Sequence, residues 1–164
     1  MEIKRIIIEG PDCSGKSTLV DRIKNEIKWD AKALRHKDGD QFERYLFEYA
    51  TADKVVFDRG HFSENVYSKL WRSGSPFSKN EKNILDSVCQ EKTLIIFSCP
   101  SSDTIKKRYL SRDYTQQIKL DEIEISRQLF ITEFKNVKKV IYKSKDFNEL
   151  EILLKKIAKI VGGK

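Results

Sequence analysis

The chain has 164 residues, a length that suits one domain with a core of its own. It carries 32 Lys and Arg against 25 Asp and Glu, and the net charge of +7 favours anionic partners without separating a nucleotide from a nucleic acid. It has no apolar run of about 18 residues, so we expect no membrane span. Three cysteines without metal-ligand spacing, and a first strand that leaves no room for a signal peptide, predict a reducing, cytoplasmic location.

The first predicted element is a buried strand over residues 3–8, and a helix is predicted over 17–28. The stretch between them, residues 10–18, reads Gly-Pro-Asp-Cys-Ser-Gly-Lys-Ser-Thr. It fits G-x-x-x-x-G-K-S/T, the P-loop pattern, at every fixed position. A strand before it and a helix after it are the context that this pattern requires, so we take the match as specific.

The P-loop predicts a site for a nucleoside triphosphate. Gly10 and Gly15 permit backbone conformations and close approaches that a side chain would block. Successive N–H groups can then converge on phosphate oxygens at a helix N-terminus. Lys16 supplies a cation for the β- and γ-phosphates, and the Ser17 hydroxyl can ligate Mg²⁺. We therefore predict that ATP is bound by Gly10, Asp12, Cys13, Ser14, Gly15, Lys16, Ser17 and Thr18.

Strands and helices alternate along the rest of the chain. We expect strands over residues 31–36, 55–58, 93–98 and 137–142. Helices are expected over 40–50, from about 62 to 71, over 78–90, from 101 through 109, over 120–136 and over 147–161. The polar segment 111–119 has no apolar periodicity and is interpreted as a mobile lid. This alternation predicts an α/β fold in which a parallel sheet of about five strands is covered on both faces, in a single domain over 1–164.

Ligands in such sheets bind beyond the carboxyl ends of the strands, so residues 10–18 and 58–61 should share one crevice. Asp58 ends an apolar strand, and a buried carboxylate is costly unless it is paired or binds a metal. We expect Asp58 to be a Mg²⁺ ligand or an acid/base group and Arg59 to hold a phosphoryl group. The alternative is a structural Asp58–Arg59 pair that closes the strand.

Further arginines are candidates for binding phosphate. Arg108 and Arg112 are four residues apart, a spacing that suits an anion between them, although a solvated basic face is the alternative. Arg127 occupies one place of an apolar stripe formed by Leu120, Ile123, Phe130 and Phe134. An inward arginine needs a partner, which could be a phosphate, Asp58 or, by snorkelling, water. Arg35, at the end of a weak strand, is a less specific candidate.

Three aromatic side chains are further candidates for contacts with the ligand. His61 follows the Asp58 turn, and Tyr45 and Tyr49 share one face of the second helix. For all of them, packing within the protein is the more common role.

These residues resemble the thymidylate kinase branch of the P-loop nucleoside monophosphate kinases. Asp12 matches an acidic P-loop residue that contacts the acceptor sugar in that family. The family's Asp-Arg-aromatic motif with a following Ser and Tyr is similar to Asp58-Arg59-Gly60 with Ser63 and Tyr67. Its lid segment resembles Pro100, Arg108 and Arg112, its later helix arginine resembles Arg127, and its acceptor-phosphate arginine resembles Arg35.

The resemblance implies a three-layer P-loop kinase fold, ATP and Mg²⁺ as cofactors, a nucleotide acceptor and, as in many members, a homodimer. Its substrate-binding residues would be Asp12, Arg35, Arg59, Ser63, Tyr67 and Arg127. The sequence departs from the family at Gly60, where an aromatic residue is usual, and at Cys13, where the P-loop lacks an arginine. The helical segment between residues 40 and 53, which supplies base recognition in the family, is also shorter.

The sequence thus predicts transfer of the γ-phosphoryl group of ATP to a nucleoside monophosphate, with dTMP or a related deoxynucleotide as the first choice. A nucleoside, a modified DNA base or a polynucleotide end is the alternative acceptor, although nucleic acid is not favoured. A nucleotide-gated switch is the third reading, and the absence of a guanine-reading Asn-Lys-x-Asp sequence argues against the usual GTPase.

Overall fold

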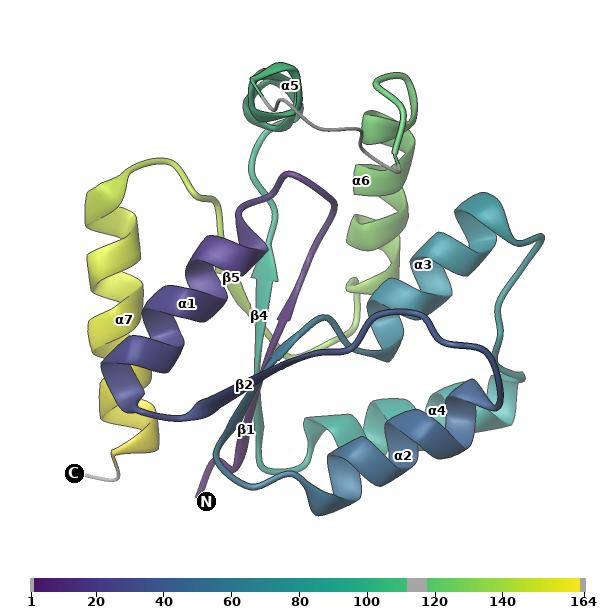
Figure 1. Ribbon diagram of the computed structural model, residues 1–164, viewed down its shortest axis with the longest axis horizontal. Helices are drawn as coiled ribbons and strands as arrows, with labels where there is room; N and C mark the ends of the chain where they lie inside the picture. The colour runs from purple at the N-terminus through teal and green to yellow at the C-terminus, as the bar shows by residue number, and fades with distance from the viewer. Residues whose placement is uncertain (1, 112–117, 163–164) are drawn as a thin grey trace.

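A computed structural model describes residues 2–111 and 118–162 (Figure 1). Its sheet has the order β2-β3-β1-β4-β5, and all its neighbouring strands are parallel. The strands are β1 (Arg5–Glu9), β2 (Asp30–Ala33), β3 (Val55–Asp58), β4 (Thr93–Ser98) and β5 (Val140–Tyr142). The predicted five-stranded parallel sheet is confirmed.

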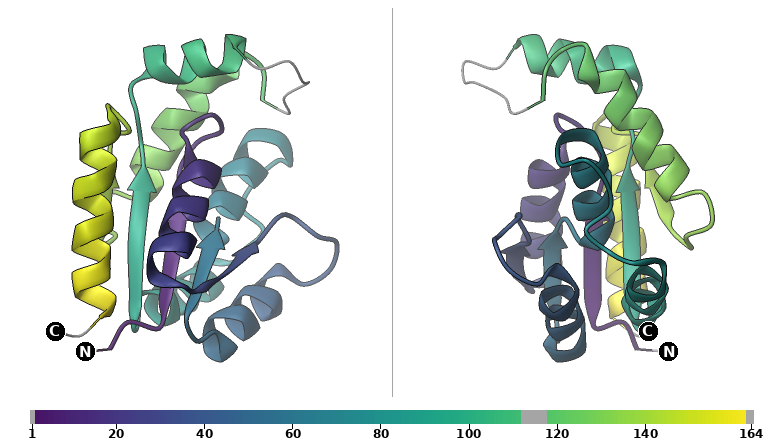
Figure 2. Two further views of the ribbon diagram at one scale, coloured as in Figure 1. Left: turned by 60° about the vertical axis from the view of Figure 1, so that its left-hand side comes forward. Right: turned by 90° about the vertical axis from the view of Figure 1, so that its right-hand side faces the viewer.

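Helices cover both faces of this sheet (Figures 1 and 2). One face carries α1 (Lys16–Ile27) and α7 (Phe147–Val161). The other carries α2 (Gln41–Thr51), α3 (His61–Trp71), α4 (Lys79–Gln90) and α6 (Glu122–Glu133). The helix α5 (Ser102–Leu110) lies across the C-terminal edge of the sheet, beside the P-loop (Figure 2).

Both faces of β1 are buried because successive side chains of a strand point to opposite faces. Ile6 and Ile8 pack in the core on the α1 and α7 side, whereas Ile7 packs in the core formed with α2, α3, α4 and α6. The near-continuous apolar run of β1 therefore has a partner on each side. This strand holds the P-loop at the centre of the sheet.

The predicted bounds of two elements, β2 and α6, need correction. The second strand ends at Ala33 rather than at residue 36, and its four residues are all exposed, as on a polar sheet edge. The helix α6 is shorter than predicted, and Leu120 is 42% exposed, so it does not extend the buried stripe. Ile118, which is 1% exposed, is buried in its place, beside Ile123. Most of the predicted lid, residues 112–117, lies outside the described residues.

Within the described ranges, every helix is too short or too polar to cross a membrane.

Candidate active site

The P-loop follows β1 and ends at the first turn of α1. Gly10 has φ 145° and Gly15 has φ 92°, conformations that L side chains rarely adopt. A Cβ at Gly10 would also lie 2.1 Å from the Ser98 carbonyl oxygen on β4. Cys13, at the tip of the loop, packs with Ile105 and Ile118. The loop is thus wedged between the central strands and α5.

Lys16 lies inside this loop. Its ammonium group donates to the Gly10 carbonyl at 2.8 Å and to the Pro11 carbonyl at 2.7 Å. Burial, with the nearby charge of Arg59, lowers the pKa of Lys16 to about 8. A bound triphosphate would give the Lys16 ammonium group an anionic partner in place of these carbonyls.

The predicted metal ligands Ser17 and Asp58 meet across the crevice. The Ser17 hydroxyl donates to Asp58 Oδ2 at 3.4 Å, while Asp58 Oδ1 is buried without a hydrogen-bond partner among the described residues. A buried carboxylate oxygen without a donor is costly, and Mg²⁺ is typically held by one or two protein oxygens together with substrate phosphates. The pair therefore fits Mg²⁺.

Arg59 is the next residue in the chain after Asp58, but the two side chains do not form an ion pair. It forms an ion pair with Asp12 of the P-loop at 2.6 Å, and its guanidinium lies 5.0 Å from the centre of the Tyr67 ring. Burial opposes the charged form of Arg59, but Tyr67, Asp12 and Asp58 outweigh it and raise its pKa. The structural Asp58–Arg59 pair, one alternative from the sequence, is absent. Arg59 instead links the turn after β3 to the P-loop.

Glu9, which the sequence analysis did not select, is fully buried at the end of β1. It accepts the N–H of Gly60 at 2.7 Å and both the N–H, at 3.3 Å, and the hydroxyl of Ser63. Burial raises the pKa of Glu9 to about 7. The signal was present in the sequence, because Glu9, like Asp58, is a carboxylate that ends an apolar strand. Ser63, predicted to bind substrate, is directed to Glu9.

Arg108 lies on the other side of the P-loop. It donates to the Ser14 carbonyl at 3.1 Å and, beyond β5, to the Ser144 hydroxyl at 2.8 Å. Arg108, Ser144 and the start of α1 line a cavity of about 260 Å³. Its partner in the prediction, Arg112, falls outside the described residues.

The remaining arginine candidates do not meet at the P-loop. Arg127 donates to the Pro100 carbonyl at 3.1 Å and lies 3.4 Å from Glu124, so it does not pair with Asp58. Arg35 is exposed in the loop after β2. It lies two residues beyond Ala33, which is opposite Asp58 in the neighbouring strand β3.

The histidine and tyrosines next to the site are buried in the core. His61 is fully buried between the Tyr49 hydroxyl, at 2.9 Å, and Asp86, at 2.8 Å. Tyr45 and Tyr49 are both within the core cluster, as the commoner role of such residues predicts.

No protein-family model matches this chain. It is 26% identical over 132 residues to the SPbeta prophage-derived uncharacterized protein YorR of Bacillus subtilis (strain 168), covering 76% of this chain and 80% of that protein. The crystal structure of Bacillus subtilis YorR in complex with phosphorylated GDP superposes with a TM-score of 0.83, at 21% identity, over 96% of this chain and 95% of that chain.

Two kinases of known activity have more distant structures. Deoxyadenosine kinase from M. mycoides with bound dCTP gives a TM-score of 0.63 at 15% identity, over 95% of this chain and all 100% of that chain. Shikimate kinase from Acinetobacter baumannii in complex with shikimate gives 0.63 at 10% identity, over 99% and 95%. The chain has the P-loop kinase fold, and these neighbours do not single out the thymidylate kinase branch.

Proposed function

We propose that this protein is a kinase that transfers the γ-phosphoryl group of ATP to a nucleotide acceptor, with dTMP or a related deoxynucleotide as the first candidate. The observation that carries the proposal is the meeting of Lys16, the Ser17–Asp58 pair and the Arg59–Asp12 pair at one edge of the sheet. These groups provide positive charge and oxygen ligands where a phosphoryl group would be transferred.

On the donor side, the loop N–H groups and Lys16 would hold the phosphates of ATP. Ser17 and Asp58 would hold Mg²⁺, which neutralises charge on the phosphate oxygens. Arg108 borders the cavity beside the loop, which offers room for the rest of the donor nucleotide. Phosphoryl transfer needs no covalent bond between the substrate and the protein, so the protein contributes by positioning the reactants and stabilising their charge.

On the acceptor side, Arg59 is the group best placed to bind an acceptor oxygen, and Asp12 holds its guanidinium against the P-loop. Tyr67, Arg35, Ser63 and Arg127 remain candidates from the sequence resemblance alone. Arg112 remains a proposed contributor of charge from the lid. The name of the M. mycoides neighbour, deoxyadenosine kinase, and the YorR complex with phosphorylated GDP support a nucleotide or nucleoside ligand.

A nucleoside acceptor is the second candidate, and the arginines favour it. Arg127 is engaged by Pro100 and Glu124, and Arg35 is exposed. Among the candidate acceptor arginines that the structure describes, Arg59 alone therefore lies at the P-loop. A nucleoside would need fewer cations than a monophosphate.

The experiment is an assay of ADP formation from ATP over a panel of nucleoside monophosphates, nucleosides and short DNAs, with Lys16→Ala as the inactive control. Turnover that depends on a monophosphate supports the first candidate, and turnover only with a nucleoside or DNA supports an alternative acceptor. ATP binding without stimulated turnover by any acceptor would refute the kinase proposal and leave the nucleotide-gated switch.

A further inference from the structure

Arg59, the arginine that the proposed function places at the acceptor, has a strained backbone. Its φ is 76°, in the left-handed region that residues other than glycine rarely adopt. Such a conformation persists only where the surrounding structure determines it. At Arg59 the chain leaves the sheet, its N–H donates to the Ile8 carbonyl at 3.0 Å, and its guanidinium reaches Asp12 at 2.6 Å. Whatever holds this turn therefore directs the arginine.

The two N–H groups that follow Arg59 are both held by buried side chains. The Gly60 N–H donates to Glu9 at 2.7 Å, and the His61 N–H donates to the Tyr49 hydroxyl at 3.0 Å. A Cβ at Gly60 would lie only 2.7 Å from the Tyr49 hydroxyl, so α2 approaches the turn more closely than any other residue type would allow. The turn is clamped between β1 and α2.

The imidazole of His61 orients the Tyr49 hydroxyl. Tyr49 Oη lies 2.9 Å from His61 Nδ1, and His61 Nε2 lies 2.8 Å from Asp86 Oδ1 on α4. Burial lowers the pKa of His61, so its ring is neutral. Burial opposes ionisation of Asp86, but hydrogen bonds from His61 and Lys82 outweigh it and lower the pKa of Asp86. A carboxylate only accepts, so Nε2 carries the ring proton, Nδ1 accepts the Tyr49 O–H, and a Tyr49 lone pair is left for the His61 N–H.

The Asp86 end of this chain of hydrogen bonds is anchored to a third helix. Lys82 donates to Asp86 Oδ2 at 2.7 Å and pairs with Glu133 of α6 at 3.0 Å. The ring of His61 is therefore held by groups that are themselves held.

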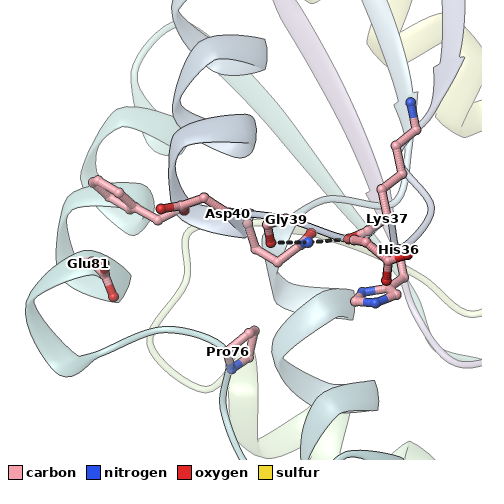
Figure 3. A pocket seen from close by; sticks show the side chains of 9 residues that line it. His36, Lys37, Gly39, Asp40, Pro76 and Glu81 are labelled. Carbon is pink, nitrogen blue, oxygen red and sulfur yellow. Dashed lines mark hydrogen bonds between the residues drawn. The ribbon is translucent and has the colours of Figure 1, made fainter.

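The helix α2, which carries Tyr49, is fixed at its N-terminus. The Asp40 side chain accepts the N–H of Glu43 at 3.0 Å, and the Gln41 amide donates to the Gly39 carbonyl at 3.1 Å. Asp40 and Gly39 lie in the wall of a cavity of about 430 Å³ at this end of the helix (Figure 3). Tyr49 is fully buried and does not line this cavity, so its hydroxyl meets the turn and not a ligand.

We propose that Tyr49 is a positioning residue: its hydroxyl, oriented by Asp86 through His61, keeps Arg59 in the left-handed conformation that directs the guanidinium to the P-loop. The role of Arg59 at the acceptor rests on the proposed function, whereas the clamp itself does not. Tyr49 acts on phosphoryl transfer only through this turn.

Tyr45 separates this role from simple packing in the core. It lies one helical turn earlier on α2 and is 1% exposed, and its hydroxyl has no hydrogen-bond partner in the described part of the chain. Replacement of either tyrosine by phenylalanine keeps the ring, but only Tyr49→Phe takes the acceptor from the His61 N–H. Tyr45→Phe is therefore the matched control.

The first test follows the conformation of residue 59 by urea unfolding and needs no activity. Glycine is unstrained at a left-handed φ and alanine is not, so the folding equilibrium constant of Arg59→Gly should exceed that of Arg59→Ala about three- to tenfold. When Tyr49→Phe is added to both, the turn can relax, and this ratio should fall to about one or below. Tyr45→Phe should leave the ratio unchanged. A ratio that Tyr49→Phe does not lower would overturn the inference.

The second test follows turnover. Tyr49→Phe should lower kcat/KM for the acceptor about tenfold or more, while the Kd of ATP changes less than about twofold, because the phosphate loop is untouched. In an Arg59→Ala background the same substitution should lower turnover no further, since Tyr49 acts through Arg59. Equal losses in the two backgrounds would overturn the inference.

Asp86 allows the chain to be tested from its other end, also if Tyr49→Phe does not fold. Its side chain is 27% exposed, so its loss is easier for the fold to accept. Asp86→Ala frees the His61 ring and should lower the Gly-to-Ala ratio at residue 59 at least about twofold. Asp86→Asn keeps an oxygen that can accept the Nε2 proton and should restore the ratio. No loss of the ratio in Asp86→Ala, or an equal loss in both variants, would overturn the inference.

The two proposals fail in different ways. If the unmodified protein transfers no phosphoryl group to any acceptor, the kinase proposal fails and the stability ratios at residue 59 decide the inference. If transfer occurs but Tyr49→Phe leaves those ratios unchanged, the kinase proposal stands and the inference fails.

Discussion

The Glu9 carboxylate accepts the backbone N–H of Gly60 at 2.7 Å and thereby joins the strand before the P-loop to the turn that carries Asp58 and Arg59. A Cβ at Gly60 would lie 3.0 Å from Glu9 Oε1 and 2.7 Å from the Tyr49 hydroxyl. This close approach accounts for glycine at a position where the thymidylate kinase pattern has an aromatic residue. The two segments that would hold donor and acceptor are coupled through one buried carboxylate.

Glu9→Gln should make the stability of the protein less sensitive to a rise in pH from about 4.5 to 7. Burial raises the folded-state pKa of Glu9 from its ordinary value of 4.5 to about 7, so its contribution to stability is complete below about pH 4.5 and is lost as the pH rises through 7. Glutamine can accept both N–H groups without this loss. Urea unfolding from pH 4 to pH 9 should show the variant gaining up to about 3 kcal/mol on the unmodified protein. A difference in stability that does not change with pH would contradict this account of Glu9.

Gly10→Ala should be much more destabilising than Gly39→Ala. Both glycines have positive φ, 145° and 105°, so both substitutions strain the backbone, typically by about 1–3 kcal/mol. A Cβ at Gly39 meets no atom within 4 Å, whereas a Cβ at Gly10 collides with the backbone of β4. We expect the loss in free energy of unfolding to be larger at Gly10 by about 2 kcal/mol or more. Equal losses at the two positions would show that the loop shifts away from Ser98 at little cost.

Asp58→Asn should raise the Mg²⁺ concentration needed for half-maximal activity by about tenfold or more, because one anionic ligand is lost. It should not lower the stability of the free protein, since it removes a buried carboxylate oxygen that has no partner among the described residues. Magnesium titrations and thermal melts measure the two effects. Asp53→Asn, at an exposed carboxylate paired with Lys4, is the matched control and should change neither the magnesium requirement nor activity.

The sequence was most informative where one local signal decides the structure. The strands over 55–58 and 93–98 were predicted with the observed bounds, because long apolar runs between turn residues suit the centre of a parallel sheet. Asp40 and Ser78 cap their helices with their side chains, at the positions where the sequence predicted helices over 40–50 and 78–90 to begin. The meeting of Ser17 with Asp58 followed from the rule that parallel strands end at one edge.

Partners that come from distant elements could not be predicted in the same way. The apolar stripe of Leu120, Ile123, Phe130 and Phe134 placed Arg127 next to the core. Its partner, however, is the backbone carbonyl of Pro100 after β4, and a sequence pattern does not reveal which carbonyl a side chain will meet. The contact of His36 with Glu64 joins a loop to a helix 28 residues further along the chain. Such contacts depend on the packing of α2 and α3, which periodicity does not determine.

The most direct test of the kinase proposal is to follow the labelled γ-phosphate of ATP in the presence of dTMP and Mg²⁺, with Lys16→Ala and the exposed helix variant Lys24→Ala in parallel. The account predicts that label appears in dTDP with the unmodified protein and Lys24→Ala, and at least about a hundredfold more slowly with Lys16→Ala. Transfer of the label to another nucleotide or to a nucleoside would support the kinase proposal but identify a different acceptor. Label that remains in ATP or is released only as inorganic phosphate, whichever acceptor is offered, would contradict the account.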